Sequence, residues 1–449
     1  MPFDTFSPSG PLNVAVIGTG IAGMSAAWLL DKGHTVTVYE KNGRVGGHSN
    51  TVEAPGPHGP VPVDTGFIVY NPMNYPNLVA LFDHLGVPTK PSDMSFGASI
   101  DDGAVEYGSA GLFAQKRNIV RPRFWRMLRD ILRFYREAPG FLNSPSDHHL
   151  SLGEYIDRGA YSESFVYDHL LPMGAAIWST PVADMRDYPA AAFLNFCKNH
   201  CLLQVNGRPL WRTVDGGSRE YVRRLTAPYA ERIITGAEIR AVRRLPSGVV
   251  IEHADGSQTA YDHVVIATHA DEALALLGDA DADERSILGS FGYTKNLALL
   301  HQDETLMPKR RAAWSSWNYM SGQGSDGSAS VCVTYWMNRL QGLPDHTPLF
   351  VTLNPHRAPA AGKTLRQFLY DHPTFDRRAI AAQRELPRIQ GPRRTWFCGS
   401  YCGHGFHEDA LQAGLAVAEA IGGIARPWTV QGASDRLAAP FTAELQDAA

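Results

Sequence analysis

Apolar and polar positions near the start of the chain fall into short apolar runs separated by a glycine-rich turn. Residues 14–17 form an apolar run, residues 21–30 carry small and apolar side chains over a helical length, and residues 35–40 form a second apolar run that ends in an acid. Short apolar runs predict buried strands, and the longer segment between them predicts a helix. The pattern therefore predicts a strand–turn–helix–strand unit of an α/β fold with a parallel sheet.

Later segments extend this pattern towards the middle of the chain. Alternation over residues 61–70 predicts a strand, and residues 73–86 predict a helix that ends at Gly86. Two apolar runs, at 232–239 and 261–269, predict further strands, and residues 248–256 predict a hairpin that turns at Asp255 and Gly256. Strands that return after long helical stretches are typical of a parallel sheet assembled from distant parts of the chain.

The first turn carries the glycine pattern Gly18-x-Gly20-x-x-Gly23. Gly18 allows the tight turn, Gly20 lets the backbone approach a pyrophosphate, and Gly23 lets the helix pack against the strand. The helix begins at Ile21 and Ala22, where free N–H groups and a partial charge of about +0.5 favour phosphate. This stretch predicts a dinucleotide-binding site.

The acid that ends the second run is Glu40, about twenty residues after the glycine turn, where it can accept hydrogen bonds from a ribose 2′-hydroxyl. The glycine pattern also occurs at residues 322–327, but that copy follows an aromatic stretch and leads into a strand instead of a helix. We interpret the second copy as an ordinary loop. No second nucleotide-binding unit for NAD(P)H is therefore expected.

The loop after Glu40 combines cations with paired glycines. Lys41 and Arg44 can neutralise phosphate charge, while Gly46 and Gly47 allow the backbone to approach a pyrophosphate closely. A solvent-exposed glycine loop without a ligand is the alternative. Its position directly after the ribose acid favours a loop that folds back over the dinucleotide.

Composition narrows the class of protein. The chain has 449 residues, 44% hydrophobic and 19% charged, which is typical of a globular protein with one large core or two intertwined domains. A net charge of −4 gives no reason to expect nucleic acid as a partner, and five cysteines suggest no disulfide framework. Neither a secretory signal nor a membrane-spanning run is evident, so we expect a cytoplasmic protein.

Residues 116–136 stand out because eight Lys or Arg side chains alternate with apolar and aromatic ones, against a single acid, Asp130. A basic amphipathic helix suits an anionic membrane surface, where each cation contributes about 1 kcal/mol. The alternative is a helix that packs on its own domain and exposes a solvated basic face. If the first reading holds, the protein associates peripherally with the inner face of the membrane.

The glycine pattern, Glu40 and residues 43–47 together resemble the flavin-containing amine oxidoreductase superfamily, which includes monoamine oxidases, protoporphyrinogen oxidase and carotenoid desaturases. The resemblance implies FAD, held by a Rossmann-like domain of the amine oxidase and glutathione reductase type. It also implies a mixed α+β substrate domain built from insertions. The ranges expected are 11–90, 215–275 and 390–425 for the FAD-binding domain, 91–214 and 276–389 for the substrate domain, and 426–449 for a C-terminal tail.

The resemblance implies further flavin contacts. An acid–x–glycine step at residues 64–66 leads a loop under the flavin, and a strand, a loop and a final helix from residue 396 to Ile421 present an N-terminus to it. At His48 amine oxidases usually carry Arg, which leaves that contact open. The implied contacts are His48, Thr65, Gly66, Phe67, Ile239 for the adenine, Thr268, Gly399, Ser400, Gly405, Phe406, His407 and Ala410.

Candidate catalytic residues are fewer. Tyr70 and His407 fall near the expected flavin ring, and Lys295 falls in a strand comparable to one in which amine oxidases hold a water near flavin N5. A strand tyrosine on the surface and an ordinary surface lysine are the alternatives for Tyr70 and Lys295. Cys197, His200 and Cys201 have no further ligands at convincing metal-ligand spacing. Cys398, Cys402, His404 and His407 could also form a metal cluster, but the resemblance already explains their loop as part of the flavin domain, so no metal is expected.

Aromatic positions indicate the substrate. Trp178, Tyr335, Phe406 and Tyr70 are candidate substrate contacts in an apolar cavity. Segments 43–51, 314–319 and 403–407 resemble a bacterial subgroup of predicted NAD/FAD-binding proteins that includes desaturases of furan fatty-acid formation. This resemblance implies desaturation, or isomerisation of a double bond, in an unsaturated or methyl-branched fatty acyl chain. The alternatives are a flavin amine oxidase for a small amine and a flavin-binding accessory protein without turnover; the oligomeric state stays open.

Overall fold

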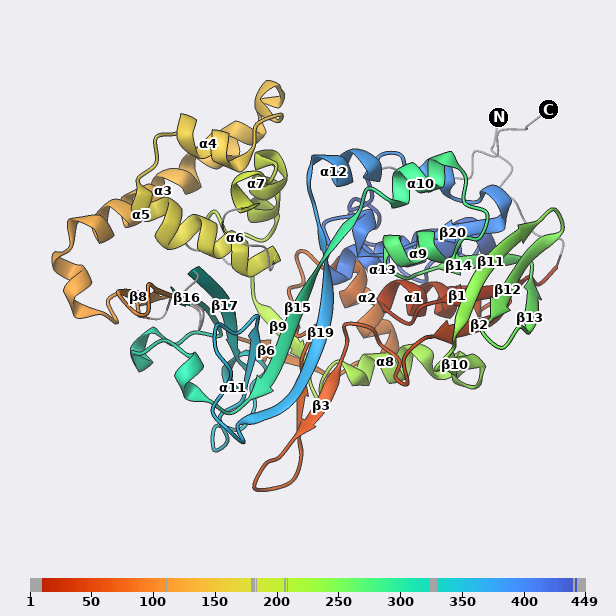
Figure 1. Ribbon diagram of the computed structural model, residues 1–449, viewed down its shortest axis with the longest axis horizontal. Helices are drawn as coiled ribbons and strands as arrows, with labels where there is room; N and C mark the ends of the chain where they lie inside the picture. Colours follow the sequence, from red (N-terminus) through yellow and green to blue (C-terminus); the bar gives the residue numbers. More distant parts are fainter. Residues whose placement is uncertain are drawn as a thin grey trace.

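A five-stranded parallel sheet forms the half of the molecule that carries both chain ends (Figure 1). The computed structural model describes residues 10–109, 111–178, 182, 184–205, 207, 209–323, 329–438 and 441. The second glycine pattern, at 322–327, therefore lies mostly outside the described residues. The strands, in sheet order, are β10 (Ile233–Thr235), β2 (Thr35–Glu40), β1 (Asn13–Ile17), β14 (His263–Ile266) and β20 (Thr395–Phe397).

This parallel sheet is buried on both faces, as its apolar runs predict. The central strands β1 and β14 lie in parallel register, and their residues Val14–Val16 and Val264–Ile266 are fully buried. Helices α1 (Ile21–Leu30) and α13 (His407–Gly422) pack against each other. They approach closely because Gly414 has no side chain; a Cβ there would overlap the carbonyl oxygen of Ala22.

Smaller elements surround the parallel sheet. A three-stranded antiparallel sheet contains β11 (Ile239–Leu245), β12 (Gly248–His253) and β13 (Gln258–Tyr261), and the predicted turn at Asp255 and Gly256 joins β12 to β13. The strand predicted at 232–239 is instead two strands, because Gly236 in a left-handed conformation separates β10 from β11. The helices here are α2 (Pro76–Leu85), α8 (Arg219–Thr226), α9 (Ala270–Leu276), α10 (Ala282–Leu288) and α12 (Arg377–Gln383).

The second half is built on a seven-stranded mixed sheet. Its order is β19 (Thr364–Thr374), β15 (Gly292–His301), β18 (Phe350–Leu353), β17 (Ala329–Trp336), β16 (Trp317–Gln323), β7 (Phe96–Ile100) and β8 (Val105–Gly108). The long antiparallel pair β15 and β19 runs between the two halves in Figure 1. The helices of this half are α3 (Pro122–Leu142), α4 (Leu152–Arg158), α5 (Glu163–Phe165), a π-helix η3 (Val166–Leu170), α6 (Leu171–Trp178), α7 (Ala190–Asn199) and α11 (Met337–Leu340).

Two small sheets connect the halves: β5 (Val69–Tyr70), β9 (Trp211–Val214) and β6 (Thr89–Ser92) form one, and β3 (Thr51–Ala54) and β4 (Val61–Asp64) form the other. The strand predicted at 61–70 is therefore broken, because residues 65–67 leave the sheet and line a cavity. The predicted helix at 73–86 is confirmed as α2, which ends at a left-handed Gly86.

The strands of the parallel sheet all fall within the ranges expected for the FAD-binding domain, and those of the seven-stranded sheet within the ranges expected for the substrate domain. The division into two domains itself stays a prediction. The expected surface tail is more closely packed than its name suggests: Trp428 stacks on Trp28 of α1 with ring centroids 5.8 Å apart, and the nearly buried side chain of Arg426 pairs with Glu419 at 2.7 Å.

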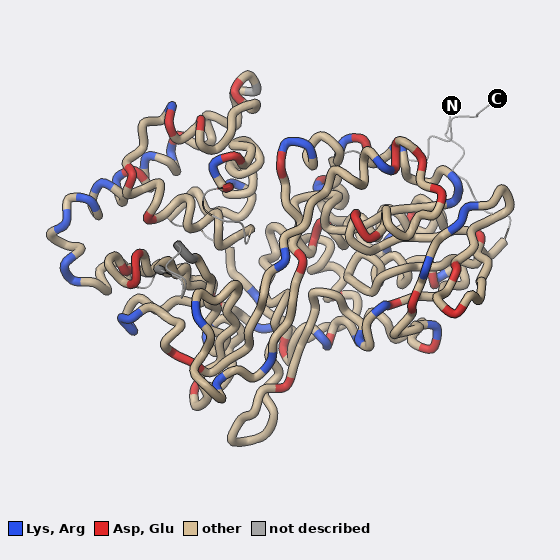
Figure 2. Tube along the Cα trace, viewed as in Figure 1, with Lys and Arg blue, Asp and Glu red and all other residues tan. Residues whose placement is uncertain are grey.

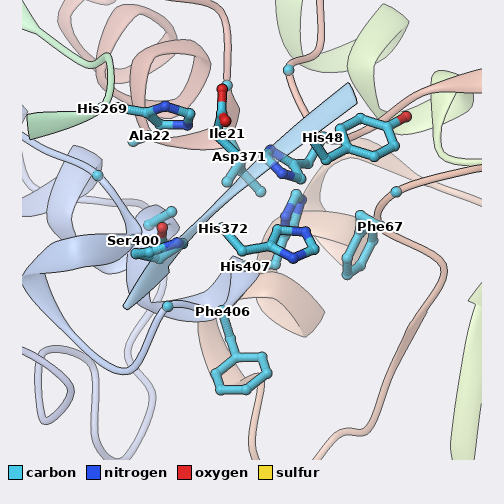
Figure 3. A pocket seen from close by; sticks show the side chains of 18 of the residues that line it. Ile21, Ala22, His48, Phe67, His269, Asp371, His372, Ser400, Phe406 and His407 are labelled. Atoms are coloured by element: carbon cyan, nitrogen blue, oxygen red, sulfur yellow. The ribbon is translucent and has the colours of Figure 1, made fainter. Parts of the chain in front are cut away.

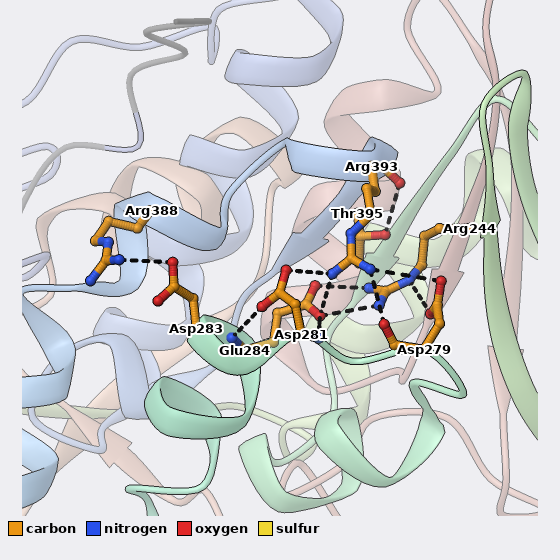
Figure 4. A network of polar contacts seen from close by, with 8 residues as sticks. All are labelled: Arg244, Asp279, Asp281, Asp283, Glu284, Arg388, Arg393 and Thr395. Carbon is orange, nitrogen blue, oxygen red and sulfur yellow. Dashed lines mark hydrogen bonds and ion pairs between the residues drawn. The ribbon is translucent and has the colours of Figure 1, made fainter. Parts of the chain in front are cut away.

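A buried ion-pair network fastens the small antiparallel sheet to the parallel one (Figure 4). The fully buried side chain of Arg244, on β11, donates to Asp279 at 2.5 Å and to both oxygens of Glu284 at 2.8 and 3.1 Å. Arg393, next to β20, reaches the same Glu284 at 2.6 Å. Because each charge in this network has a partner, the cost of burying it is offset.

Candidate active site

A cavity of about 1560 Å³ lies between the two halves and draws its walls from both. A pocket for one drug-sized ligand has about 300–1,000 Å³, so this cavity has room for a cofactor and a second molecule. One end is lined by the glycine turn, the end of β2 and the start of α13; the other is lined by α6, α7, β17 and β19.

The three glycines of the turn have different structural roles. A Cβ on Gly18, whose φ is +105°, would lie 2.7 Å from the carbonyl oxygen of Ala267, and a Cβ on Gly23 would overlap the carbonyl oxygen of Gly18. Both glycines therefore serve packing. A Cβ on Gly20, by contrast, would meet no protein atom within 4 Å and would enter the cavity. Gly20 thus keeps open the space in front of the N-terminus of α1.

Glu40 lines the same end of the cavity and is buried. Its carboxylate accepts hydrogen bonds from the backbone N–H and hydroxyl of Thr19 and, at 2.8 and 2.9 Å, from the backbone and side-chain N–H groups of Asn42. The acid therefore also holds the glycine turn in place. A ribose hydroxyl at this point would share the carboxylate with Thr19 and Asn42.

The loop after Glu40 folds back over the glycine turn. Gly47, in a left-handed conformation, lies so close that a Cβ would come within 2.9 Å of the Gly20 Cα. Arg44 braces the loop by donating to the carbonyls of Gly47 at 2.6 Å and Ser49 at 3.3 Å, and Lys41 pairs with Glu272 of α9. Residues 41–44 of this loop are exposed, yet Lys41, Arg44 and Gly47 all line the cavity, as a loop that folds over a dinucleotide requires.

The start of α13 forms another part of the cavity wall. Gly399, Ser400, Gly405, Phe406, His407 and Ala410 all line the cavity. Asp409 caps the helix by accepting a hydrogen bond of 2.7 Å from the Phe406 N–H. The other backbone N–H groups of the first turn lie at the N-terminus of this sixteen-residue helix, where the helix dipole is positive.

Four histidines meet where the two ends of the cavity join (Figure 3). The ring of His48 lies 5.5 Å from that of His372 and 6.5 Å from that of His269, and 5.1 Å from the ring of Tyr370. Burial lowers the pKa of His48 well below its usual value, that of His372 to about 4 and that of His407 to about 3. These three rings are therefore neutral at pH 7.

His407 is the most tightly held of the four. Its ring stacks parallel on Phe67 at 3.8 Å, as Figure 3 shows, and its Nε2 lies 2.8 Å from the hydroxyl of Tyr221. Tyr221 is in turn hydrogen-bonded to Ser49. A relay of hydroxyls thus reaches the cavity wall at His407 and fixes the orientation of the imidazole.

The far end of the cavity is an apolar, aromatic wall. Trp178 of α6 packs on Phe196 of α7 with ring centroids 4.7 Å apart, and Phe406 stacks on the same Phe196 at 4.9 Å. The wall also includes Met94, Phe96, Met173, Ile177, Leu202, Trp211, Trp317, Tyr335, Leu340, Leu353, Phe368 and Phe375. Such a wall suits a long apolar ligand.

Comparison with known proteins agrees with this geometry. The model of the family described as flavin containing amine oxidoreductase matches residues 21–342. The chain belongs to this family. AofH of Mycobacterium tuberculosis, provisionally named as a flavin-containing monoamine oxidase, is 26% identical over 84% of this chain and 78% of its own length.

Two solved structures show the same fold as this family member. Cyclohexylamine oxidase from Brevibacterium oxydans IH-35A has a TM-score of 0.67 at 15% identity, over 92% of this chain and 99% of its own. A CLA-producing fatty acid isomerase from P. acnes has a TM-score of 0.64 at 16% identity, over 91% and 98%. The chain is thus an FAD-dependent oxidoreductase of the amine oxidase family, with the expected Rossmann-like sheet and mixed second sheet.

The residues present fit the FAD that this family implies. The open space in front of Gly20 suits a pyrophosphate, and Glu40 beside it suits a ribose. Ile21, Ala22, Thr65, Gly66, Phe67, Ile239 and Thr268 also line the cavity, as expected for flavin contacts, and so does His48. Gly23 and Gly46 are not among the lining residues: Gly23 packs on Gly18, and a Cβ on Gly46 would lie 2.6 Å from the Ser49 carbonyl oxygen.

Two predicted site residues lie elsewhere in this amine oxidase fold. Tyr70 is absent from the cavity lining; its ring is buried in the core, edge-on to Phe82 at 5.4 Å, so it is neither a site residue nor a surface tyrosine. Lys295 is a surface residue with a side chain 72% exposed, 4.0 Å from Asp371. Neither side chain reaches the cavity: Val69, next to Tyr70 on β5, lines it while Tyr70 packs in the core, and no residue of β15 lines it.

Sequence reasoning missed the contribution of β19. His372, Tyr370 and Phe368 on this strand line the cavity, as does His269 at the start of α9. The strand does not alternate in sequence, since Phe368, Leu369 and Tyr370 are consecutive, and residues 368–373 all line the cavity. No local alternation therefore marks this strand as part of the site.

The described residues contain neither a cluster of metal ligands nor a membrane-spanning helix. No group of three or more His, Cys, Asp or Glu side chains is arranged to hold a metal ion there. Within the same part of the chain, no helix is long and apolar enough to cross a membrane.

Proposed function

We propose that this FAD-dependent oxidoreductase acts on an unsaturated or methyl-branched fatty acyl chain, which it desaturates or in which it shifts a double bond. The observation that carries the proposal is the apolar wall at the far end of the cavity. Among the described lining residues, the acids are Glu40, Glu238, Glu272 and Asp371. The first three belong to the nucleotide half, and Asp371 faces Lys295 and Lys41.

The energetics of this wall favour an acyl chain over a small amine. Burying each CH₂ of an acyl chain contributes about 0.8 kcal/mol, so a long chain gains much of its affinity from the wall alone. An ammonium group loses its hydration there and finds no carboxylate partner at the far end. Phe406, the aromatic residue expected to face an amine, stacks on Phe196 as part of the same wall.

In this family bound FAD supplies a two-electron acceptor. The chain's own residues hold the acyl chain against the apolar wall, exclude water and take up a proton. His48 is the candidate for the last task, since its ring is neutral at pH 7 and lines the cavity where the two ends join. The side-chain amide of Asn296 donates to Nδ1 of His372 at 3.2 Å, so Nε2 carries the hydrogen of the neutral ring and His372 is a hydrogen-bond donor in the cavity, which leaves His48 as the candidate proton acceptor.

Sequence resemblance supports the same substrate class. Segments 43–51 and 403–407, which resemble the bacterial subgroup with furan fatty-acid desaturases, include cavity-lining residues at Gly43, Arg44, Gly47 and His48 and at residues 404–407. The third segment, at 314–319, contributes Trp317 to the wall.

Amine oxidation is the second candidate, favoured by the similarity to AofH at 26% identity. The two can be separated by mixing the purified flavoprotein anaerobically with unsaturated fatty acids and with small amines. Loss of flavin absorbance with fatty acids only supports the proposal, whereas loss with amines only contradicts it. If neither reduces the flavin and no double-bond isomer is formed, the protein is a flavin-binding accessory protein.

A further inference from the structure

Helix α3 and the 3₁₀ turn before it, η1 (Lys116–Val120), form an exposed tip that is both basic and apolar. In Figure 2 the blue cationic positions run along this edge of the molecule, on the side away from the parallel sheet. We propose that this tip, residues 112–136, docks on the surface of an anionic lipid bilayer. The inference goes beyond the proposed function and holds whatever the substrate is.

The two faces of α3 are sharply divided. Phe124, Met127, Phe134 and Ala138 form one buried stripe at helical spacing, so the helix is anchored to its own domain. Asp130 lies on this stripe, where it accepts a hydrogen bond of 2.8 Å from the Ser162 N–H. Because the one acid of residues 116–136 is buried, the exposed charges of this range are all positive; the next acid, Glu137, pairs with Arg133 at 3.6 Å.

Exposed apolar side chains lie among these cations on the outward face of the tip. Val120 is 80% exposed, Trp125 50% and Leu132 57%, and Phe113 and Ile119 lie beside them. The Trp125 indole N–H donates to the Ile119 carbonyl at 2.8 Å, and the indole ring packs on Phe113. These contacts fix the conformation of the exposed apolar cluster around Trp125. This arrangement matches an anionic bilayer, in which acyl chains lie below anionic headgroups. The exposed aromatic and aliphatic side chains can enter the acyl region while the surrounding Arg and Lys side chains contact the headgroups.

Several of the cations are available to a partner. Among the described residues, Lys116, Arg126 and Arg136 make no ion pair with the protein, although each is exposed. Charge complementarity therefore favours an anionic bilayer surface over a cationic or neutral one. The excess of positive charge on this edge contrasts with the net charge of −4 of the whole chain.

The tip is directly connected to the cavity. Arg123 of α3 forms a two-pronged ion pair with Asp168 in the π-helix, both hydrogen bonds being 3.0 Å long. The next residue, His169, lines the cavity, as does Tyr135 of α3 itself. A bilayer docked on α3 would thus lie next to the apolar end of the cavity.

Vesicle co-sedimentation of the intact holoprotein tests the inference. We expect binding to vesicles of phosphatidylcholine mixed with phosphatidylglycerol, little binding to phosphatidylcholine alone, and loss of binding at about 1 M salt, where the Debye length is about 3 Å. The variant K116Q/R126Q/R136Q should bind more weakly by about fivefold for each cation removed. V120S/W125S should also bind more weakly while its charge is unchanged.

The matched control is R223Q/R243Q/R388Q, which removes three similarly exposed cations from the nucleotide half. It should bind as the unmodified protein does, and flavin content and melting temperature should report that every variant is folded. Equal binding by the two triple variants, or no binding of the unmodified protein to anionic vesicles, overturns the inference. Concentration-dependent dimerisation that V120S/W125S abolishes, without vesicle binding, would assign the face to a second copy and also overturn it.

Discussion

The two ends of the cavity are built in different ways. The nucleotide end consists of backbone: glycines at 18, 20 and 47, a helix N-terminus, and a loop that folds back within a few residues. The apolar end consists of side chains that reach it from α6, α7, β17 and β19, far apart in the chain. Backbone geometry specifies a cofactor common to the family, whereas side chains specify what an individual member binds. The predictions below test whether the two ends can be disturbed independently.

The largest effect is expected from two neighbouring glycines with opposite roles. In G23A the new Cβ overlaps the Gly18 carbonyl oxygen, so the helix must move, and we expect a loss of more than about 4 kcal/mol of stability and no folded flavoprotein. In G20A the Cβ meets only the cavity, at an ordinary φ of −63°. The apoprotein should keep its melting temperature while FAD affinity falls about tenfold or more. Equal melting temperatures for G20A and G23A apoproteins would contradict the division of roles.

The next effect concerns the framework behind the nucleotide end. R244A removes the fully buried partner of Glu284, which then keeps only Arg393 as an ion-pair partner among the described residues, and should cost about 3 kcal/mol in urea unfolding. The control is R243A, one residue away on β11, where an exposed arginine pairs with Glu252 and its loss should cost under about 1 kcal/mol. Similar unfolding midpoints for the two variants would show that the network in Figure 4 contributes little.

A third change disturbs the apolar end alone. M173E places a carboxylate in the acyl wall and should weaken binding of an unsaturated fatty acid at least about tenfold, because the charge must be desolvated. M173L keeps the volume and should bind as before. Flavin content, measured from absorbance, should match the unmodified protein in both variants. Loss of flavin in M173E but not in M173L would mean that the two ends are coupled.

The histidines at the junction between the two ends of the cavity should make the stability of the protein depend on pH. Histidines 48, 372 and 407 are neutral when folded, so between pH 6.5 and about 4 the unfolded chain binds more protons than the folded one. Stability therefore falls on acidification, by about 1.4 kcal/mol per pH unit for each histidine. H372Q should reduce the slope of unfolding free energy against pH by one histidine's share. An unchanged slope would place His372 in a more solvated setting.

The smallest effect is expected at Lys295. K295Q changes an exposed side chain and should leave flavin content, turnover and stability within about 0.5 kcal/mol of the unmodified protein. A large fall in turnover would restore the lysine to the catalytic site and contradict the register of β15.

The same contrast explains what the sequence could and could not reveal. Gly18, Gly20, Glu40 and the loop at 41–47 act within one local unit, so spacing alone was enough to predict their place in the cavity. Lys295 lies on β15, a strand of which no residue lines the cavity. Tyr70 depends on strand register, because its neighbour Val69 lines the cavity and a shift of one residue turns a side chain to the opposite face. His372 was missed for the same reason, because its position at the junction follows from the pairing of β19 with β15.

The central claim is that one cavity holds FAD at its backbone-built end and an acyl chain at its apolar end. Mass spectrometry of the small molecules released from the purified native protein tests this most directly, with G20A and M173E as paired variants. We predict FAD together with a fatty acyl compound, the FAD diminished in G20A and the acyl compound diminished in M173E. Protein that releases FAD with an amine and no acyl compound, or that contains no flavin after expression with adequate flavin supply, would contradict the account.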